Sequence, residues 1–239
     1  MNMKCNWLAA ILLWLSASMA GAQLYAPKYS NEFLKIGVGA RAAGMGNAIS
    51  AVTNDVTAGY WNPAGLMLAS PNPEVALMHS EYFAGIAKYD YAGFSTRIDD
   101  SRHIGVSVIR LGVDDIPNTL NFKDGNSFNY AKITNFSVAD WAVLLSYAQK
   151  VGKIEGLSIG GNAKVIHRSV GSFATVWGFG LDVGAFYKRK NLQTSLLLSD
   201  LTTTFNAWSF NTETFEDAFR STGNEIPQNS IELTLPSMR

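Results

Sequence analysis

The sequence predicts an all-β protein, an antiparallel transmembrane β-barrel of the kind found in the outer membrane of Gram-negative bacteria. Aromatic residues make up 12% of the chain and charged residues only 16%, whereas a typical soluble domain has about 25% charged residues. Apolar residues alternate with small or polar ones over several segments, which is typical of strands with one apolar face. Tight and longer links alternate between these segments, like the short periplasmic turns and longer extracellular loops of such barrels.

Residues 1–22 have the features of a secretory signal peptide. Lys4 precedes an apolar run at residues 7–19, and the small residues of a cleavage site follow at 20–22. The run is shorter than the roughly 20 apolar residues of a transmembrane helix, which disfavours the alternative of a membrane anchor. Cleavage after this segment removes Cys5, the one cysteine of the chain. We therefore expect an exported protein without disulfides or a cysteine-based metal site.

The clearest strand pattern lies at residues 177–187. Trp177, Phe179 and Leu181 begin an apolar face with aromatic residues at both ends, while glycines and Asp182 share the opposite face. Aromatic ends suit the two interfaces of a bilayer, and a small, polar face suits a barrel lumen. The same alternation predicts strands at residues 74–82, 88–97, 102–111, 136–150, 156–167, 177–188 and 192–198, and the start of another at 231–235.

The links between these segments decide between two kinds of β-structure. A soluble β-sandwich also has alternating strands, but it has no reason to sort its links by length. Here tight links are predicted at 98–101, 151–155 and 189–191, and longer ones at 83–87, 112–135, 168–176 and 199–230. This sorting favours the barrel and places the start of the chain in the periplasm.

Residues 23–72 are expected to form a plug inside the barrel. Residues 32–70 do not alternate cleanly and are rich in glycine and alanine. Their glycines fit neither the dinucleotide-binding fingerprint nor the P-loop, so we interpret them as sites of tight turns and close packing. Pro63 keeps Asn62 out of the helical region of backbone conformation.

Two motifs in this block resemble the N-terminal signature of the PorV/PorQ family of outer-membrane proteins, which are relatives of the FadL and OmpP1-like fatty-acid transporters. The first, at residues 33–48, contains Gly39, Arg41, Gly44 and Gly46, and the second, at residues 51–66, contains Asn62, Pro63 and Ala64. Residues 79–86 and 112–119 also match the family. The resemblance implies a barrel of about fourteen strands with the N-terminal segment inside it.

The resemblance also implies a role in type IX secretion. One branch of the family carries exported proteins, through their C-terminal sorting domains, from the translocon to a cell-surface attachment complex. Another branch anchors a surface component of that complex. The family is not known for catalysis, so the resemblance implies no enzymatic activity and no cofactor.

The barrel domain, residues 73–239, is expected to be incomplete. Family members continue through several more strands, and barrel chains of this kind end on an aromatic residue, whereas this chain ends on Arg239. We therefore expect a C-terminally truncated gene product or a fragment. Its strands, about seven or eight in number, would form a curved open sheet, a half-barrel.

Candidate chemical sites are few. His79, His103 and His167 lie far apart without metal-ligand spacing, so no metal site is predicted. Lysine plus arginine and aspartate plus glutamate each total 19, which excludes a general nucleic-acid binder. Lys164 and Asp182 fall on the lumen faces of neighbouring strands, where they either pair across the ladder or are solvated separately.

Two predicted loops carry aromatic side chains that are candidates for protein binding. One contains Phe122, Phe128 and Tyr130, and the other contains Phe205, Trp208 and Phe210. The alternative is that each set packs on itself as a cap over the barrel mouth.

Three functions remain open from the sequence. The first is a non-enzymatic outer-membrane protein of the secretion system, whose partners are membrane lipid, secretion components and exported proteins with sorting domains. The second is a FadL-like conduit for hydrophobic small molecules, which needs a continuous apolar path through the barrel. The third is a purely structural outer-membrane protein.

Overall fold

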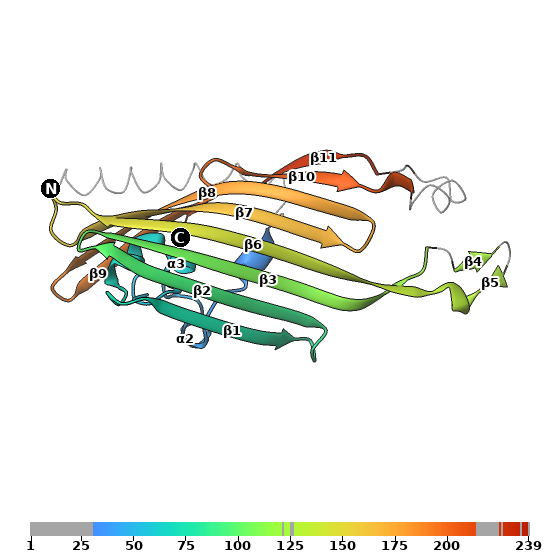
Figure 1. The fold of residues 1–239 in the computed structure, drawn as a ribbon, viewed down its shortest axis with the longest axis horizontal. Coiled ribbons are helices and arrows are strands. Elements are labelled where there is room, and N and C mark those ends of the chain that lie inside the picture. The colour runs from blue at the N-terminus through green and yellow to red at the C-terminus, as the bar shows by residue number, and fades with distance from the viewer. Residues whose placement is uncertain are drawn as a thin grey trace, which may run out of the picture.

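The computed structural model describes residues 31–120, 122–124, 127–213, 225, 227–234 and 236–238. The predicted signal peptide at 1–22 and the first residues of the predicted plug lie outside this part of the chain. The described residues form an all-β structure, an antiparallel ten-stranded sheet with a segment of short helices packed on one face (Figure 1).

The sheet is a meander in which strands that follow one another along the chain lie side by side. Its first six strands are β1 (Glu74–Tyr82), β2 (Ala87–Asp99), β3 (Arg102–Asn118), β6 (Thr134–Lys150), β7 (Leu157–Val170) and β8 (Ala174–Arg189). The separate two-stranded sheet, β4 (Lys123–Asp124) and β5 (Ser127–Phe128), lies in the link after β3, with η3 (Tyr130–Lys132) following it.

Two strand positions are each filled by two short strands. β9 (Leu192–Ser199) pairs with the second half of β8, and β10 (Thr204–Phe210) pairs with the first half. β11 (Ser230–Thr234) pairs with β10, and β12 (Ser237–Met238) pairs with β9. Counted by position, the sheet therefore has the seven strands and the beginning of an eighth that the sequence predicts.

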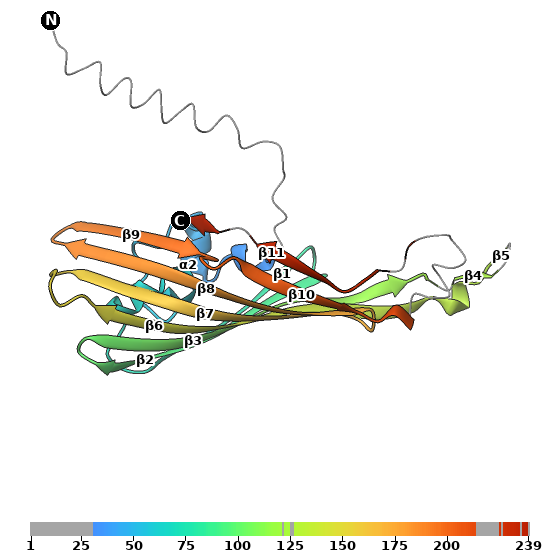
Figure 2. The same ribbon diagram turned by 90° about the horizontal axis from the view of Figure 1, so that it is seen from above.

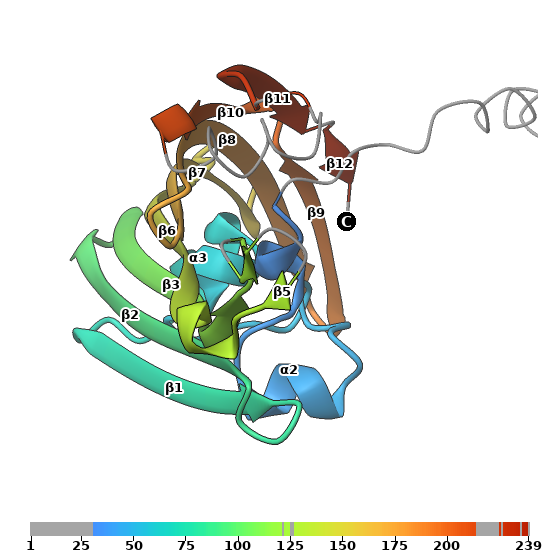
Figure 3. The ribbon, with the colours of Figure 1, turned by 90° about the vertical axis from the view of Figure 1, so that its right-hand side faces the viewer.

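The sheet is curved and open. β1 pairs with β2 alone, and among the described residues no strand follows β11 and β12. Seen along the strands, the sheet wraps around the N-terminal segment (Figure 3). Figure 2 shows β4 and β5 projecting beyond one end of the sheet. The predicted all-β fold is confirmed in this form, a curved sheet that does not close on itself.

Several strands extend further than the alternation predicts. β7 continues to Val170 and β8 begins at Ala174, so the predicted link at 168–176 shrinks to residues 171–173. It is shorter than the 151–156 link at the other end of the sheet, and the predicted sorting of links by length is therefore only partly correct. The ladder continues because backbone hydrogen bonds between strands do not depend on the polarity of the side chains.

The predicted loop at 199–230 is also wrong over its first part, because residues Thr204–Phe210 form β10.

The turn between β2 and β3 shows the local chemistry of the short-link end. Arg102 Nε donates to Asp99 Oδ2 at 2.7 Å, and the Ser101 backbone N–H donates to Asp99 Oδ1 at 2.8 Å. These donors, the guanidinium first, hold the pKa of the exposed Asp99 carboxyl well below its usual range. The turn is closed by its own side chains, as its acidic sequence suggests.

The N-terminal segment occupies the concave face of the sheet. It contains η1 (Glu32–Lys35), α2 (Ala40–Gly44), α3 (Ala58–Trp61) and η2 (Pro63–Leu68). The core that joins it to the sheet is apolar and aromatic, and its buried members include Phe33, Tyr60, Trp61, Tyr89, Tyr91, Ile109, Leu144 and Ile166. Inside the segment, Trp61 Nε1 donates to the Val38 carbonyl at 3.0 Å, which ties α3 to the chain that precedes α2.

The backbone of the segment comes closest to the sheet where β7 and β8 carry glycine. A Cβ atom at Gly160 would lie 2.5 Å from the Ala64 nitrogen, and one at Gly184 would overlap the side-chain oxygen of Asn62. Real Cβ atoms essentially never approach this closely. The glycines on the concave face therefore form the seat for the N-terminal segment.

We expect Gly160→Val to lower the free energy of unfolding by about 1–3 kcal/mol, because an overpacked contact forces the backbones apart. Gly152→Val is the matched control, since a Cβ atom at Gly152, in the link after β6, would meet no other atom within 4 Å. Denaturant titration followed by circular dichroism measures both. Equal losses for the two variants would contradict the close seating of Ala64 on β7.

Candidate functional site

The Asn62–Pro63–Ala64 motif is the polar centre of the seat. Asn62 is fully buried with an extended backbone, φ −165° and ψ 107°, as expected before proline. Its side-chain oxygen accepts from the Ala64 backbone N–H at 3.1 Å, and its amide nitrogen donates to the Ala185 carbonyl of β8 at 3.1 Å. One side chain therefore caps η2 and holds it to the sheet.

Three further side chains of the sheet complete this seat. Ser158 Oγ donates to the Ala64 carbonyl at 3.0 Å, and Asn162 Nδ2 donates to the Gly59 carbonyl at 2.9 Å. Ser146 Oγ donates to Asn162 Oδ1 at 2.7 Å, which orients the amide. All three side chains are buried. Buried backbone carbonyls need such donors, so these side chains of the sheet satisfy carbonyls of the segment.

The other predicted plug motif lies at the border of the sheet rather than in the seat. Gly39, at φ 92°, precedes α2, and its backbone N–H lies 3.1 Å from the Met78 sulfur of β1. Arg41 is exposed and donates to Asn54 Oδ1 at 3.1 Å. Gly44 and Gly46 are exposed, with open space where a Cβ atom would lie. The structure thus places the two motifs in different surroundings.

The predicted Lys164–Asp182 pair is present and buried. Lys164 Nζ lies 2.8 Å from Asp182 Oδ1, and the two residues are 5% and 6% exposed. A third residue, which the sequence did not suggest, joins them: Lys164 Nζ also lies 2.5 Å from Asp200 Oδ1. The alternative of two separately solvated charges is therefore wrong.

This charged triad lies where β9 ends and β10 has not yet begun. The Asp200 backbone N–H donates to Asp182 Oδ1 at 2.9 Å, and Thr204 Oγ1 donates to the Asp200 carboxylate. Asp200 has a positive φ of 57°, which aspartate tolerates better than most residues. The triad therefore holds in place the break between β9 and β10, the two short strands that share one strand position.

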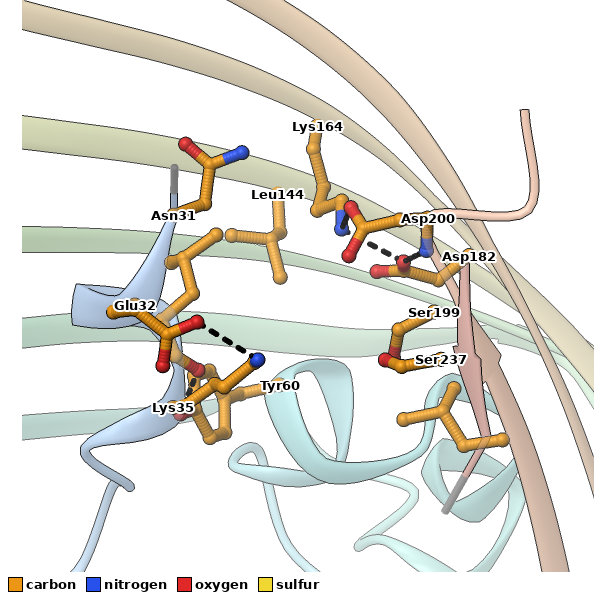
Figure 4. Close-up of a pocket in the computed structure, with 12 residues that line it drawn as sticks. Asn31, Glu32, Lys35, Tyr60, Leu144, Lys164, Asp182, Ser199, Asp200 and Ser237 are labelled. Carbon is orange, nitrogen blue, oxygen red and sulfur yellow. Dashed lines mark hydrogen bonds and ion pairs between the residues drawn. The ribbon is translucent and has the colours of Figure 1, made fainter. Parts of the chain in front are cut away.

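A small cavity opens beside the triad, between the sheet and η1 (Figure 4). Its volume is about 40 Å³, which is room for a few water molecules at most. Lys164, Asp182 and Asp200 line one side, and Glu32, Lys35 and Tyr60 line the other. The space beside the triad is thus small and polar.

The convex face has the opposite character. The ladder aligns its side chains in rows that cross the strands, and two successive rows are wholly apolar. The first comprises Leu77, Ala92, Val108, Val143, Val165 and Phe179, and the second Val75, Phe94, Val106, Leu145, Ala163 and Leu181. Nothing in the described residues covers them, and Leu77, Leu145 and Leu181 are 79%, 52% and 46% exposed.

The candidate binding aromatics lie in two different settings. Phe122 stacks on Phe128 with ring centroids 5.0 Å apart, and Tyr130 packs at 6.0 Å from Phe122. Phe128 and Tyr130 remain exposed on the projecting link after β3.

The other three aromatic residues are not in a loop, because Phe205, Trp208 and Phe210 are part of β10. Phe205 packs beside Phe179 on the convex face with ring centroids 5.6 Å apart, whereas Trp208 and Phe210 stack on each other at 5.6 Å. The predicted second binding loop is therefore wrong for these residues.

The three histidines stay apart. His79 and His167 lie on β1 and β7 with exposed or half-buried side chains, and His103 is fully buried on β3. In the part of the chain that the structure covers, no three His, Cys, Asp or Glu residues are grouped to hold a metal ion. No helix there is long and apolar enough to cross a membrane.

Comparison with known protein families and with curated proteins gives no match for this chain.

We expect Lys164→Met to destabilise the fold by about 3–5 kcal/mol, because it leaves two buried carboxylates without their cation. Lys88→Met is the matched control: Lys88 pairs with Asp114 at 3.0 Å, but both side chains are about 40% exposed, so its loss should stay within about 1 kcal/mol. Denaturant titration measures both, and a loss for Lys164→Met no larger than that for Lys88→Met would contradict the role of the triad.

Proposed function

We propose that this chain is part of an outer-membrane β-barrel, exported through the signal peptide at residues 1–22 and plugged by its N-terminal segment. One observation carries the proposal: the sheet exposes large apolar side chains on its convex face, while charged residues such as Lys164 and Asp182 are buried on its concave face. A soluble sheet does the reverse. In a bilayer, the exposed apolar rows face lipid and the polar face lines an enclosed interior.

The height of the apolar face supports this proposal. On β8, Trp177, Phe179, Leu181 and Val183 are between 44% and 51% exposed, and the same face continues to Tyr187. Ten residue steps at roughly 3.3 Å each span about 33 Å along the strand. A tilt of about 40° reduces this to roughly 25 Å, which is the height of the apolar band of outer-membrane barrels.

Within this class, a role in type IX secretion rests on the resemblance of residues 33–48 and 51–66 to the PorV/PorQ family. The N-terminal segment packed on the concave face is consistent with a protein that binds others at its surface rather than with an open pore. The exposed Phe128 and Tyr130, at the end of the sheet that carries the long links, provide aromatic anchors for a protein partner. Candidate partners are secretion components and exported proteins with C-terminal sorting domains.

The FadL-like conduit is less well supported. Such a conduit requires a continuous apolar path along the concave face, and the buried charges of Lys164, Asp182 and Asp200 interrupt that face. A purely structural role gives no reason for the exposure of Phe128 and Tyr130 on the projecting link.

The membrane placement predicts a strong dependence on depth. We expect Leu181→Arg to cost about 2–4 kcal/mol of stability in a bilayer, because it puts a charge near the midplane. Thr175→Arg is the control, since Thr175 is exposed on the same strand and the same face but beyond the aromatic Trp177; it should cost about 0–1 kcal/mol. Folding titrations into lipid vesicles measure the two, and equal costs would refute the lipid-facing assignment.

Affinity isolation from detergent-solubilised outer membrane tests the secretion role. We expect a tagged chain to recover translocon components or proteins with sorting domains. Replacing Phe128 and Tyr130 by serine should lower that recovery about tenfold or more, because hot-spot aromatics contribute roughly 2 kcal/mol each. Ile154→Ser is the control at the opposite end of the sheet, where Ile154 is 49% exposed. Recovery of the barrel alone would argue against this role.

A further inference from the structure

A row of charged and aromatic side chains borders the apolar rows of the convex face. This boundary row consists of directly paired residues on six neighbouring strands: His79, Asp90, Arg110, Trp141, His167 and Trp177. The next row away from the apolar side contains Glu81, Lys88, Gly112, Ala139, Ser169 and Thr175. At the end of the sheet that carries the long links, the convex face therefore changes from apolar to polar within one row.

The members of the boundary row contact one another. His79 Nδ1 lies 2.6 Å from Asp90 Oδ1, and an Arg110 terminal nitrogen donates to Asp90 Oδ2 at 3.0 Å. The Arg110 guanidinium carbon lies 5.6 Å from the centre of the Trp141 ring, within the range of a cation–π contact. These contacts fix the orientation of the His79 and Arg110 side chains without using all the donors of the guanidinium.

A groove crosses the boundary row at β1, β2, β3 and β6. Its volume is about 430 Å³, and its lining includes His79, Asp90, Arg110 and Trp141 on the polar side and Leu77, Ala92 and Val108 on the apolar side. Ala92 lies in the apolar row between larger residues, Leu77 and Val108. Its small side chain makes the groove deeper at this position. The groove is thus polar at one end and apolar at the other.

The guanidinium of Arg110 is turned toward the polar end. A Cβ atom at Gly112 would lie 2.8 Å from an Arg110 terminal nitrogen, so the side chain extends over Gly112, away from the apolar rows. An arginine at the edge of a bilayer reaches toward the headgroups in this way. Gly112 provides the space that this conformation needs.

The mixture of groups indicates the ligand. Arg110 suits a phosphate, because a guanidinium binds phosphate oxygens in a fixed fork geometry. The carboxylate of Asp90 can accept hydrogen bonds from hydroxyl groups, and Trp141 offers an aromatic surface. The apolar floor at Ala92 and Val108 suits an acyl chain. A phosphate, hydroxyl groups and acyl chains occur together in a phosphorylated glycolipid.

We propose that this groove binds one phosphorylated glycolipid of the outer leaflet. Its phosphate contacts Arg110, and one acyl chain lies over Ala92 and Val108. The inference rests on the proposed placement in the outer membrane, which puts the long-link end of the sheet at the outer surface. The site is separate from the plug seat and from the aromatic link, so it can be tested without either.

Native mass spectrometry of the full chain, purified from outer membrane in mild detergent, tests the site. The probes are bisphosphorylated lipid A and phosphatidylethanolamine, added in equal amounts to delipidated protein. We expect one lipid A molecule to bind in preference to phosphatidylethanolamine. Arg110→Gln and Ala92→Leu should each weaken its binding about tenfold, the first by removing the phosphate donor and the second by filling the groove.

Arg102→Gln is the matched control, because Arg102 lies on the same strand but pairs with Asp99 in the turn at the opposite end. Its lipid A binding should stay within about twofold of the wild type. Preference for phosphatidylethanolamine, absence of bound lipid from the wild type, or equal binding by all four proteins would overturn the inference. A chain that resides in the outer membrane without this lipid leaves the proposed function standing, whereas a chain found dissolved in the periplasm refutes both.

Discussion

Hydrogen bonds join the N-terminal segment to buried polar groups on the concave face of the sheet. Asn62, Ser158 and Asn162 each bond a backbone group across the contact between segment and sheet. An unsatisfied buried polar group costs about 1–3 kcal/mol, so each polar group that this contact buries needs such a partner. The glycines of β7 and β8 complete the same contact by letting the backbones approach. Sheet and segment therefore form one cooperative unit.

The buried groups of the charged triad also need partners, and they find them in ion pairs with one another. Lys164 is too deep to be solvated, and one carboxylate on the neighbouring strand would leave part of its ammonium group unpaired. The chain supplies a second carboxylate by interrupting the strand position after β9, so that Asp200 turns inward at a positive φ. The Leu201 backbone N–H then donates to the Leu181 carbonyl at 2.8 Å, which keeps the interruption on the ladder of β8. The break after β9 thus brings Asp200 to the buried charge of Lys164.

The sequence predicted what depends on period-two alternation. The bounds of β1, the facing of β8 and the pairing of Lys164 with Asp182 follow from it. It did not predict Asp200 as a partner or Thr204–Phe210 as a strand, because both depend on the break after Ser199 and on pairing with β8. Strand ends beyond the apolar rows were also missed, since backbone pairing there continues without an alternation to mark it. The contacts of Asn62 with the sheet were not predicted either, because they join residues more than a hundred positions apart.

The register of the strands determines which side chains lie on each face of the sheet. Pairing of His167 with Trp177 and of Asn162 with Asp182 belongs to the same ladder between β7 and β8. A slip of one residue would exchange the faces of a strand, so it would turn Asp182 outward among the apolar rows and Leu181 inward against the charged triad. The polar contacts of the concave face therefore select the alignment that also assembles the boundary row and its groove. The boundary row takes one residue from each of six strands. Its assembly therefore depends on the polar contacts that the concave face makes.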